Sequence, residues 1–217
     1  MGQGCADGVP VDSRPLPVIV AHRGYATLYP ENTIKALEAA VQAGASWVEV
    51  DVQLRADGVP VLAHDFDLTG GEPTLRQFAE WLAVSPGVSA FVELKRESLE
   101  AFGRQRVLDA CLDAMGGVGG WHFISFDYEV LKLAGGDVGW VLGAIDDTRL
   151  EMARRLPARW LFCHRDALTE GVPQGPWEVV VYEVATVAAA KAYLRAGIRW
   201  LETMNPGEII DGLEGVK

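Results

Sequence analysis

Short apolar runs alternate along the chain with longer segments of helical periodicity. Ile34, Leu37 and Val41 fall on one stripe of a helix, and Gly44 and Gly197 follow helix-like segments, as glycines at helix ends do. The apolar runs cover residues 18–22, 47–54, 59–64, 91–95, 122–126, 138–145, 160–164, 178–184 and 199–204. The helix-like segments cover residues 31–44, 74–83, 98–115, 127–135, 147–157 and 186–197. This alternation predicts strand–helix units and a parallel sheet.

The number of runs favours a closed α/β barrel over an open sheet. A (β/α)8 TIM barrel has eight strands, and the extra run has a local explanation. Residues 47–54 and 59–64 are separated by RADG, whose Asp57-Gly58 is a tight-turn signal, so a hairpin should follow the second barrel strand. An open, doubly wound sheet is the competitor, but the first run is not followed by a GxGxxG turn. We expect one barrel domain over residues 17–217 with a reduced insertion, preceded by a flexible arm at residues 1–16.

Charge and composition limit the partners. The 217 residues carry a net charge of −11, which argues against nucleic acid or an anionic membrane as a bulk partner. No run approaches the roughly 18 apolar residues of a membrane span, and residues 1–17 lack the apolar core of a secretory signal, so we expect no stable membrane insertion. Cys5, Cys111 and Cys163 are far apart and odd in number, which predicts unpaired thiols and a cytoplasmic protein. The oligomeric state stays open.

Carboxylates occupy the ends of two predicted strands. Glu49 and Asp51 are two residues apart, so both point to the same face of their strand, and Glu93 and Lys95 repeat this spacing on the next barrel strand. Active sites of these barrels form at the carboxyl ends of the strands. Three carboxylates at one mouth would repel each other, and a hard divalent cation with oxygen ligands is the usual remedy. The pattern therefore predicts a Mg²⁺ or Ca²⁺ site.

Two histidines are expected to join the carboxylates at a solvent-facing mouth. His22 and Arg23 end the first run, beside the strand that carries Glu49 and Asp51. If Asp57-Gly58 forms a two-residue turn, Ala56 pairs with Val59 and Asp51 pairs with His64 on one face; this inference depends on the register. Two histidines suit general acid and base catalysis, and Arg23, Lys95 and a cation can hold a phosphoryl group.

At these residues the sequence resembles the glycerophosphodiester phosphodiesterase family, which consists of metal-dependent phosphodiesterases built on a (β/α)8 barrel. The resemblance rests on HRG (22–24), PENT (30–33), EVDVQLRADGVPVLAHD (49–65) and VELK (92–95), and more loosely on SFD (125–127) and TMNP (203–206). It implies that His22 and His64 are the acid and base, that Glu49, Asp51 and Glu93 bind the metal, and that Arg23 and Lys95 contact phosphate. In PENT, Glu31 anchors Arg23 or a bound water, while Asn32-Thr33 either supports the site or caps the helix.

The chain departs from this family in ways that leave the substrate open. FDLTGGEPT follows HD where the family usually has an Arg-Thr-Thr segment, and the short stretch from Phe66 to Phe91 predicts a small lid. Tyr182 stands where many relatives have tryptophan, and Glu183 stands where a neutral residue is common. The expected function is hydrolysis of glycerophosphodiesters to sn-glycerol 3-phosphate and an alcohol, as part of lipid and glycerol metabolism. The alternatives are a lysophospholipase D and a non-catalytic phosphodiester-binding barrel, and the presence of both histidines argues against the latter.

Overall fold

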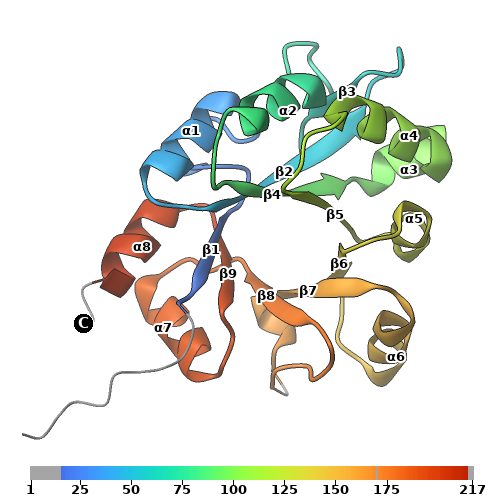
Figure 1. Ribbon diagram of the computed structural model, residues 1–217. Helices are drawn as coiled ribbons and strands as arrows, with labels where there is room; N and C mark the ends of the chain where they lie inside the picture. The colour runs from blue at the N-terminus through green and yellow to red at the C-terminus, as the bar shows by residue number, and fades with distance from the viewer. Residues whose placement is uncertain (1–15, 170, 215–217) are drawn as a thin grey trace, which may run out of the picture.

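Eight parallel strands close into a barrel in the computed structural model, which describes residues 16–169 and 171–214 (Figure 1). The strands are β1 (Val18–Ala21), β2 (Trp47–Leu54), β4 (Ser89–Leu94), β5 (Trp121–Ser125), β6 (Val138–Leu142), β7 (Ala158–His164), β8 (Glu178–Tyr182) and β9 (Trp200–Thr203). Closure is explicit, because β1 pairs in parallel with both β2 and β9. The predicted (β/α)8 barrel is therefore confirmed and the open sheet excluded. The expected arm at residues 1–16 lies, apart from Leu16, outside the described residues, as does Cys5.

Helices surround the barrel on its outer side (Figure 1). They are α1 (Ile34–Gln42), α2 (Leu75–Ala83), α3 (Arg96–Phe102), α4 (Arg104–Met115), α5 (Tyr128–Ala134), α6 (Asp147–Arg155), α7 (Val187–Arg195) and α8 (Pro206–Glu214), with a 3₁₀ turn at Arg165–Ala167. The helical segment expected at residues 98–115 is divided into α3 and α4 at Gly103, whose φ is 87°. Gly44 and Gly197 adopt the left-handed conformation expected after α1 and α7. None of the described helices is long and apolar enough to cross a bilayer.

The barrel interior is aromatic at one end and charged at the other. Trp47, Phe91, Trp160, Phe162 and Trp200 pack together inside the barrel, and we call this group the aromatic floor. Along β2 the inward face runs from Trp47 to Glu49 and Asp51, because side chains alternate between faces. Val48, Val50 and Val52 belong instead to the larger core between the barrel and the helices. The alternation thus leaves charged side chains above the aromatic floor, at the carboxyl ends of the strands.

The predicted hairpin is present, but its predicted register is wrong. Strand β3 (Pro60–Leu62) pairs antiparallel with β2, and Leu54 lies opposite Pro60. The Arg55 amide donates to the Val59 carbonyl at 3.0 Å, so the loop holds three residues rather than two. Gly58, with a φ of 87°, completes this loop, as a glycine does at the end of three-residue hairpin turns.

The changed register moves His64 out of the strand pair. The Ala63 amide donates to the Asp51 carbonyl at 3.1 Å, so Ala63 takes the place expected for His64. His64 lies beyond the end of β3, and the turn length does not determine the position of its ring. Instead, the side-chain amide of Gln53 makes two hydrogen bonds. Its Nε2 donates to the His64 carbonyl at 3.0 Å, and its Oε1 accepts from the Ser98 hydroxyl at 2.6 Å. Gln53 therefore ties the backbone of His64 to β2 and α3.

Two glycines with the same backbone conformation should respond differently to alanine. Gly24 (φ 82°) and Gly58 (φ 87°) are both left-handed, but a Cβ on Gly24 would lie 2.6 Å from the backbone carbon of Ala36. A Cβ on Gly58 would find Arg106 Nη2 at 3.8 Å as its nearest contact. We expect Gly58→Ala to cost about 1 kcal/mol and Gly24→Ala about 3 kcal/mol or more of unfolding free energy, measured in urea. Equal losses would contradict the close approach of α1 to the loop after β1.

Candidate active site

A cavity of about 180 Å³ lies at the carboxyl ends of the strands, above the aromatic floor. Its polar lining comes from five strand ends or the loops after them. The charged and polar lining residues are His22, Arg23, His64, Glu93, Lys95, Tyr182, Glu183 and Glu202. Five of these were predicted from the sequence as site residues: His22, Arg23, His64, Glu93 and Lys95. The structure therefore brings together the two histidines and both phosphate-binding candidates.

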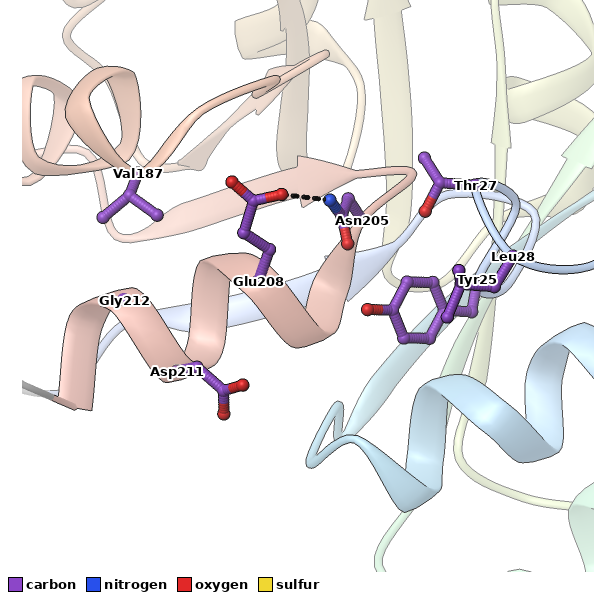
Figure 2. Close-up of a pocket in the computed structure, with 8 residues that line it drawn as sticks. All are labelled: Tyr25, Thr27, Leu28, Val187, Asn205, Glu208, Asp211 and Gly212. Carbon is purple, nitrogen blue, oxygen red and sulfur yellow. Dashed lines mark hydrogen bonds between the residues drawn. The ribbon is translucent and has the colours of Figure 1, made fainter.

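A larger groove of about 730 Å³ lies between the loop after β1 and helix α8 (Figure 2). Its charged lining consists of Glu208 and Asp211, and Glu208 accepts a hydrogen bond from Asn205. Within residues 16–169 and 171–214, no histidine, lysine or arginine lines this groove. The smaller cavity, which combines acids, bases and imidazoles, is the better candidate for chemistry despite its size.

The three predicted metal ligands lie together beneath the cavity. Glu49, Asp51 and Glu93 are buried, and one oxygen of each lies within 4.8 Å of the others. Glu49 Oε1 has no hydrogen-bond partner among the described residues. An unpartnered buried carboxylate oxygen is costly, and a hard divalent cation would satisfy it. The residues present therefore fit a metal ion bound by oxygen ligands.

Asp51 is fixed by contacts with three other side chains. Asn32 Nδ2 donates to Asp51 Oδ2 at 2.9 Å, Arg23 Nε lies 2.8 Å from the same oxygen, and Lys95 Nζ lies 3.1 Å from Oδ1. Burial opposes the ionisation of Asp51, but Lys95 and Arg23 hold its pKa below the ordinary value. Lys95 also lies 3.1 Å from Glu93 Oε1. The two cations thus neutralise part of the carboxylate cluster while keeping Asp51 charged.

Each of the three polar residues in the PENT segment makes a defined contact. Glu31 accepts two hydrogen bonds from Arg23 Nη1, at 3.1 and 3.2 Å. Thr33 caps α1 by accepting from the Ala36 amide. Asn32 adopts a left-handed φ of 57° and, besides donating to Asp51, accepts from the Asp51 amide at 3.0 Å. Of the two alternatives for Asn32-Thr33, capping applies to Thr33, and Asn32 supports the site.

Removing the Asn32 amide should destabilise the protein. Both of its hydrogen bonds are to Asp51, so Asn32→Gly, which tolerates the left-handed φ, should leave buried polar groups of Asp51 unpaired. We expect a loss of about 2–3 kcal/mol of unfolding free energy in urea, against less than about 0.5 kcal/mol for the control Gln105→Ala at the exposed contact with Asp109 on α4. Similar losses for both variants would show that the Asn32–Asp51 contact is not stabilising.

The two histidines lie in different surroundings. His22 is only 7% exposed, so the expectation of a solvent-facing position is wrong for it. His22 Nε2 lies 3.8 Å from Glu49 Oε2, and His22 Nδ1 lies 3.5 Å from Glu183 Oε1. Burial alone would lower the pKa of His22, but Glu202, Glu183 and Glu49 together raise it to about 10. The side chain of His64 is 39% exposed and contacts Asp65 at 2.7 Å.

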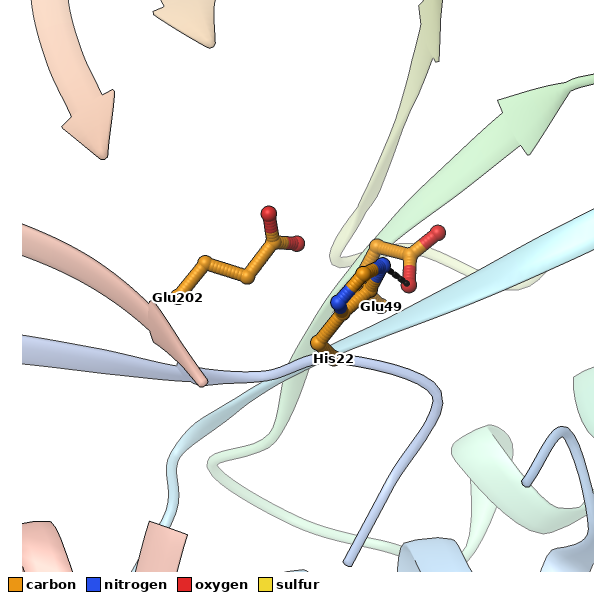
Figure 3. A group of neighbouring side chains, drawn as sticks. All are labelled: His22, Glu49 and Glu202. Carbon is orange, nitrogen blue, oxygen red and sulfur yellow. Dashed lines mark ion pairs between the residues drawn. The ribbon is translucent and has the colours of Figure 1, made fainter. Parts of the chain in front are cut away.

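Glu202 is a buried carboxylate that sequence reasoning missed. It lies on β9, is 3% exposed, and extends toward His22 and Glu49 (Figure 3). Its Oε1 has no hydrogen-bond partner among the described residues, and burial raises its pKa to about 7. The sequence feature that could have identified Glu202 is an acidic residue within the apolar run 199–204. It lies two residues after Trp200, so both side chains point to the same face of the strand. Glu183, beside His22, was noted in the sequence only as an unusual residue.

A comparison with known families matches the part of the chain that carries most of these side chains. The model of the glycerophosphoryl diester phosphodiesterase family matches residues 22–98, the segment that carries both histidines and the three clustered carboxylates. Over residues 22–98, about a third of the chain, the sequence is therefore similar to the glycerophosphoryl diester phosphodiesterase family.

The matches to individual proteins cover only part of this chain and only part of each relative. The chain is 37% identical over 87 residues to human glycerophosphoinositol inositolphosphodiesterase; the match covers 40% of this chain and 16% of the human protein. It is 39% identical over 97 residues to an uncharacterised protein of Mycobacterium tuberculosis, covering 39% of this chain and 32% of that protein. Matches to these relatives therefore cover less than a third of their length.

The fold similarity extends over nearly the whole chain. A phosphodiesterase of Oleispira antarctica, solved in complex with the product sn-glycerol 3-phosphate, aligns with a TM-score of 0.78 at 23% identity. The alignment covers 92% of this chain and 97% of that structure. A glycerophosphodiester phosphodiesterase of Parabacteroides distasonis aligns with a TM-score of 0.75 at 21% identity, covering 93% and 99%. At these identities the similarity establishes the barrel fold.

Proposed function

We propose that this protein hydrolyses glycerophosphodiesters to sn-glycerol 3-phosphate and an alcohol in a metal-dependent reaction. The observation that carries the proposal is the convergence of His22 and His64 on one cavity that also contains Arg23 and Lys95. The family match and the product bound in the Oleispira antarctica phosphodiesterase support the substrate class. This combination provides for both phosphate binding and proton transfer, which phosphodiester hydrolysis requires.

Glu49, Asp51 and Glu93 are the residues that would hold the metal. Their clustered oxygens favour Mg²⁺ or Ca²⁺, which prefer carboxylate ligands. A divalent cation bound there would supply Lewis-acid polarisation of a phosphoryl oxygen and offset the carboxylate charge. Asn32 orients Asp51 for this role through its two hydrogen bonds.

Arg23 and Lys95 are assigned to the phosphate and the histidines to proton transfer. Both cations line the cavity and are held by carboxylates, Arg23 by Glu31 and Lys95 by Glu93. Because carboxylates surround His22 and retain its proton, we assign His22 as the general acid that protonates the leaving alcohol. His64 then is the general base that accepts a proton from the attacking hydroxyl group, whether this belongs to water or to the glycerol 2-hydroxyl.

A lysophospholipase D activity is the second candidate, and an aromatic groove favours it. The groove has a volume of about 600 Å³ and is lined by Leu54, Phe66, Leu68 and Phe102 together with polar residues of the hairpin. Phe66 is 41% exposed, follows His64 by two residues, and packs against Phe102 with a ring separation of 6.2 Å. An acyl chain would bury this apolar surface if the substrate were a lysophospholipid.

The decisive experiment measures release of sn-glycerol 3-phosphate, and of lysophosphatidic acid, from a panel of glycerophosphodiesters and lysophospholipids. Each substrate is tested with and without EDTA. Turnover of the glycerophosphodiesters supports the leading proposal, and preferential turnover of lysolipids supports the second. Saturable binding of glycerophosphodiesters without any turnover would make the barrel a non-catalytic binding protein and overturn both enzymatic proposals.

A further inference from the structure

We call the cavity that is lined by His22 and His64 the catalytic cavity. Another cavity opens beside it, over the ends of β4, β5 and β6. It has a volume of about 530 Å³, and we call it the arginine pocket. Its lining includes Arg96, Phe126, Trp140, Val141, Thr148 and Arg149. Phe126 and Val141 line both cavities, so the two share a wall.

The catalytic cavity is small for a complete glycerophosphodiester. Ligand pockets are typically about 300–1,000 Å³, whereas this cavity holds about 180 Å³. One end of a diester whose phosphate lies between Arg23 and Lys95 must therefore extend beyond the cavity. The arginine pocket, across the shared wall of Phe126 and Val141, offers that space.

The charge of the arginine pocket differs from that of its surroundings. Among the described residues its lining contains two arginines and no carboxylate, although the chain has a net charge of −11. The catalytic cavity, the groove of Figure 2 and the aromatic groove all have carboxylates in their lining. An anionic ligand group is thus favoured here, and a cationic group is disfavoured.

Arg96 is available for such a group. Its guanidinium lies over the Phe126 ring, 5.2 Å from the centroid, and makes one long hydrogen bond of 3.5 Å to the Phe126 carbonyl. No carboxylate among the described residues lies within ion-pair distance of Arg96, whereas Arg149 is paired with Asp146. Arginine suits phosphate because its planar fork can donate two parallel hydrogen bonds.

We propose that the arginine pocket binds a phosphate group carried by the alcohol portion of the substrate, with Arg96 as the principal contact. This inference rests on the proposed function, because it assigns the preferred substrates among glycerophosphodiesters. Those with a phosphorylated alcohol should be favoured over those with the same alcohol unphosphorylated. Arg96 determines this specificity and takes no part in the chemical step.

The test compares glycerophosphoinositol 4-phosphate with glycerophosphoinositol, which differ by one phosphate on the alcohol. We expect Arg96→Gln to lower the ratio of their kcat/KM values about tenfold or more, the effect of losing a charge-assisted hydrogen bond. Turnover of glycerophosphoinositol should stay near wild type. The control is Arg76→Gln, which removes an exposed arginine on α2 that pairs with Asp113. An unchanged ratio in Arg96→Gln, or an equal loss for both substrates, would overturn the proposal.

A binding experiment tests the assignment of the arginine pocket without depending on hydrolysis. Failure of the protein to hydrolyse either diester would count against the proposed function and not against this assignment. Calorimetric titration of the full chain with inositol 4-phosphate should show affinity that Arg96→Gln weakens about tenfold and Arg76→Gln leaves unchanged. Equal affinity in Arg96→Gln and wild type, or no measurable binding to wild type, would overturn the assignment. So would inorganic phosphate binding as tightly as inositol 4-phosphate, since the pocket would then be a site for free anions.

Discussion

Removal of divalent cations is expected to abolish hydrolysis of glycerophosphodiesters, and addition of Mg²⁺ or Ca²⁺ should restore it. The reason is the burial of Glu49, Asp51 and Glu93 within one cluster, where three carboxylates repel each other unless a cation joins them. The measurement is release of sn-glycerol 3-phosphate after prolonged dialysis against EDTA, before and after each metal is returned. Any activity that remains after dialysis should come from metal that the EDTA did not remove.

A substitution of one predicted metal ligand tests whether the loss of activity arises at the cluster of Glu49, Asp51 and Glu93. Glu93→Gln should raise the metal concentration needed for half-maximal activity, whereas Glu100→Gln on the exposed face of α3 should not. Binding of the cation should also raise the thermal midpoint of wild type and do so less for Glu93→Gln, because a ligand that binds only the folded state stabilises it. Full activity in excess EDTA would disprove the metal assignment.

Replacement of either histidine should lower kcat by about 100-fold or more, the usual contribution of a general acid or base. His22→Ala and His64→Ala are compared with His164→Ala, which removes a histidine at the end of β7 that does not line the catalytic cavity. Near-normal turnover in both His22→Ala and His64→Ala would show that the pair is structural.

A substrate with a different leaving group can distinguish the general acid, assigned to His22, from the general base, assigned to His64. A p-nitrophenyl ester of glycerol phosphate releases a weakly basic alcohol that needs little protonation, so it should restore much of the activity of His22→Ala. It should restore little in His64→Ala, because the attacking group still has to lose its proton. The opposite pattern would exchange the two assignments. The stability of the cation-free protein should fall in His22→Ala, since Glu49 and Glu183 lose their imidazole neighbour, and change little in His64→Ala.

The parts of the site that follow strand periodicity could be predicted from the sequence. The spacing of Glu49 and Asp51, and of Glu93 and Lys95, was sufficient to place four charged side chains inside the barrel, because alternation along a strand is local. The predicted barrel rested in the same way on local patterns, namely the alternation of apolar runs with helical segments. The catalytic and binding roles of these residues stay predictions.

The parts that depend on tertiary contacts could not be predicted. The position of His64 was inferred from a two-residue turn, but Gly58 ends a three-residue loop and Gln53 holds the His64 backbone instead. The surroundings of buried His22 include carboxylates from other strands, among them Glu202 from the far end of the chain. No local pattern links residues 22 and 202, which become neighbours only when β1 and β9 close the barrel.

The aromatic floor determines how substrate and products travel. Trp160 and Phe91 are fully buried within it, and Phe162, which is also buried, lines the catalytic cavity, so packed side chains close the barrel at its other end. Substrate must therefore enter, and both products must leave, through the single mouth at the carboxyl ends of the strands. If Arg23 and Lys95 hold phosphate as proposed, bound product blocks the next substrate, and sn-glycerol 3-phosphate should act as a competitive inhibitor. Turnover at high product concentration then depends on the fraction of the protein whose mouth is occupied by product.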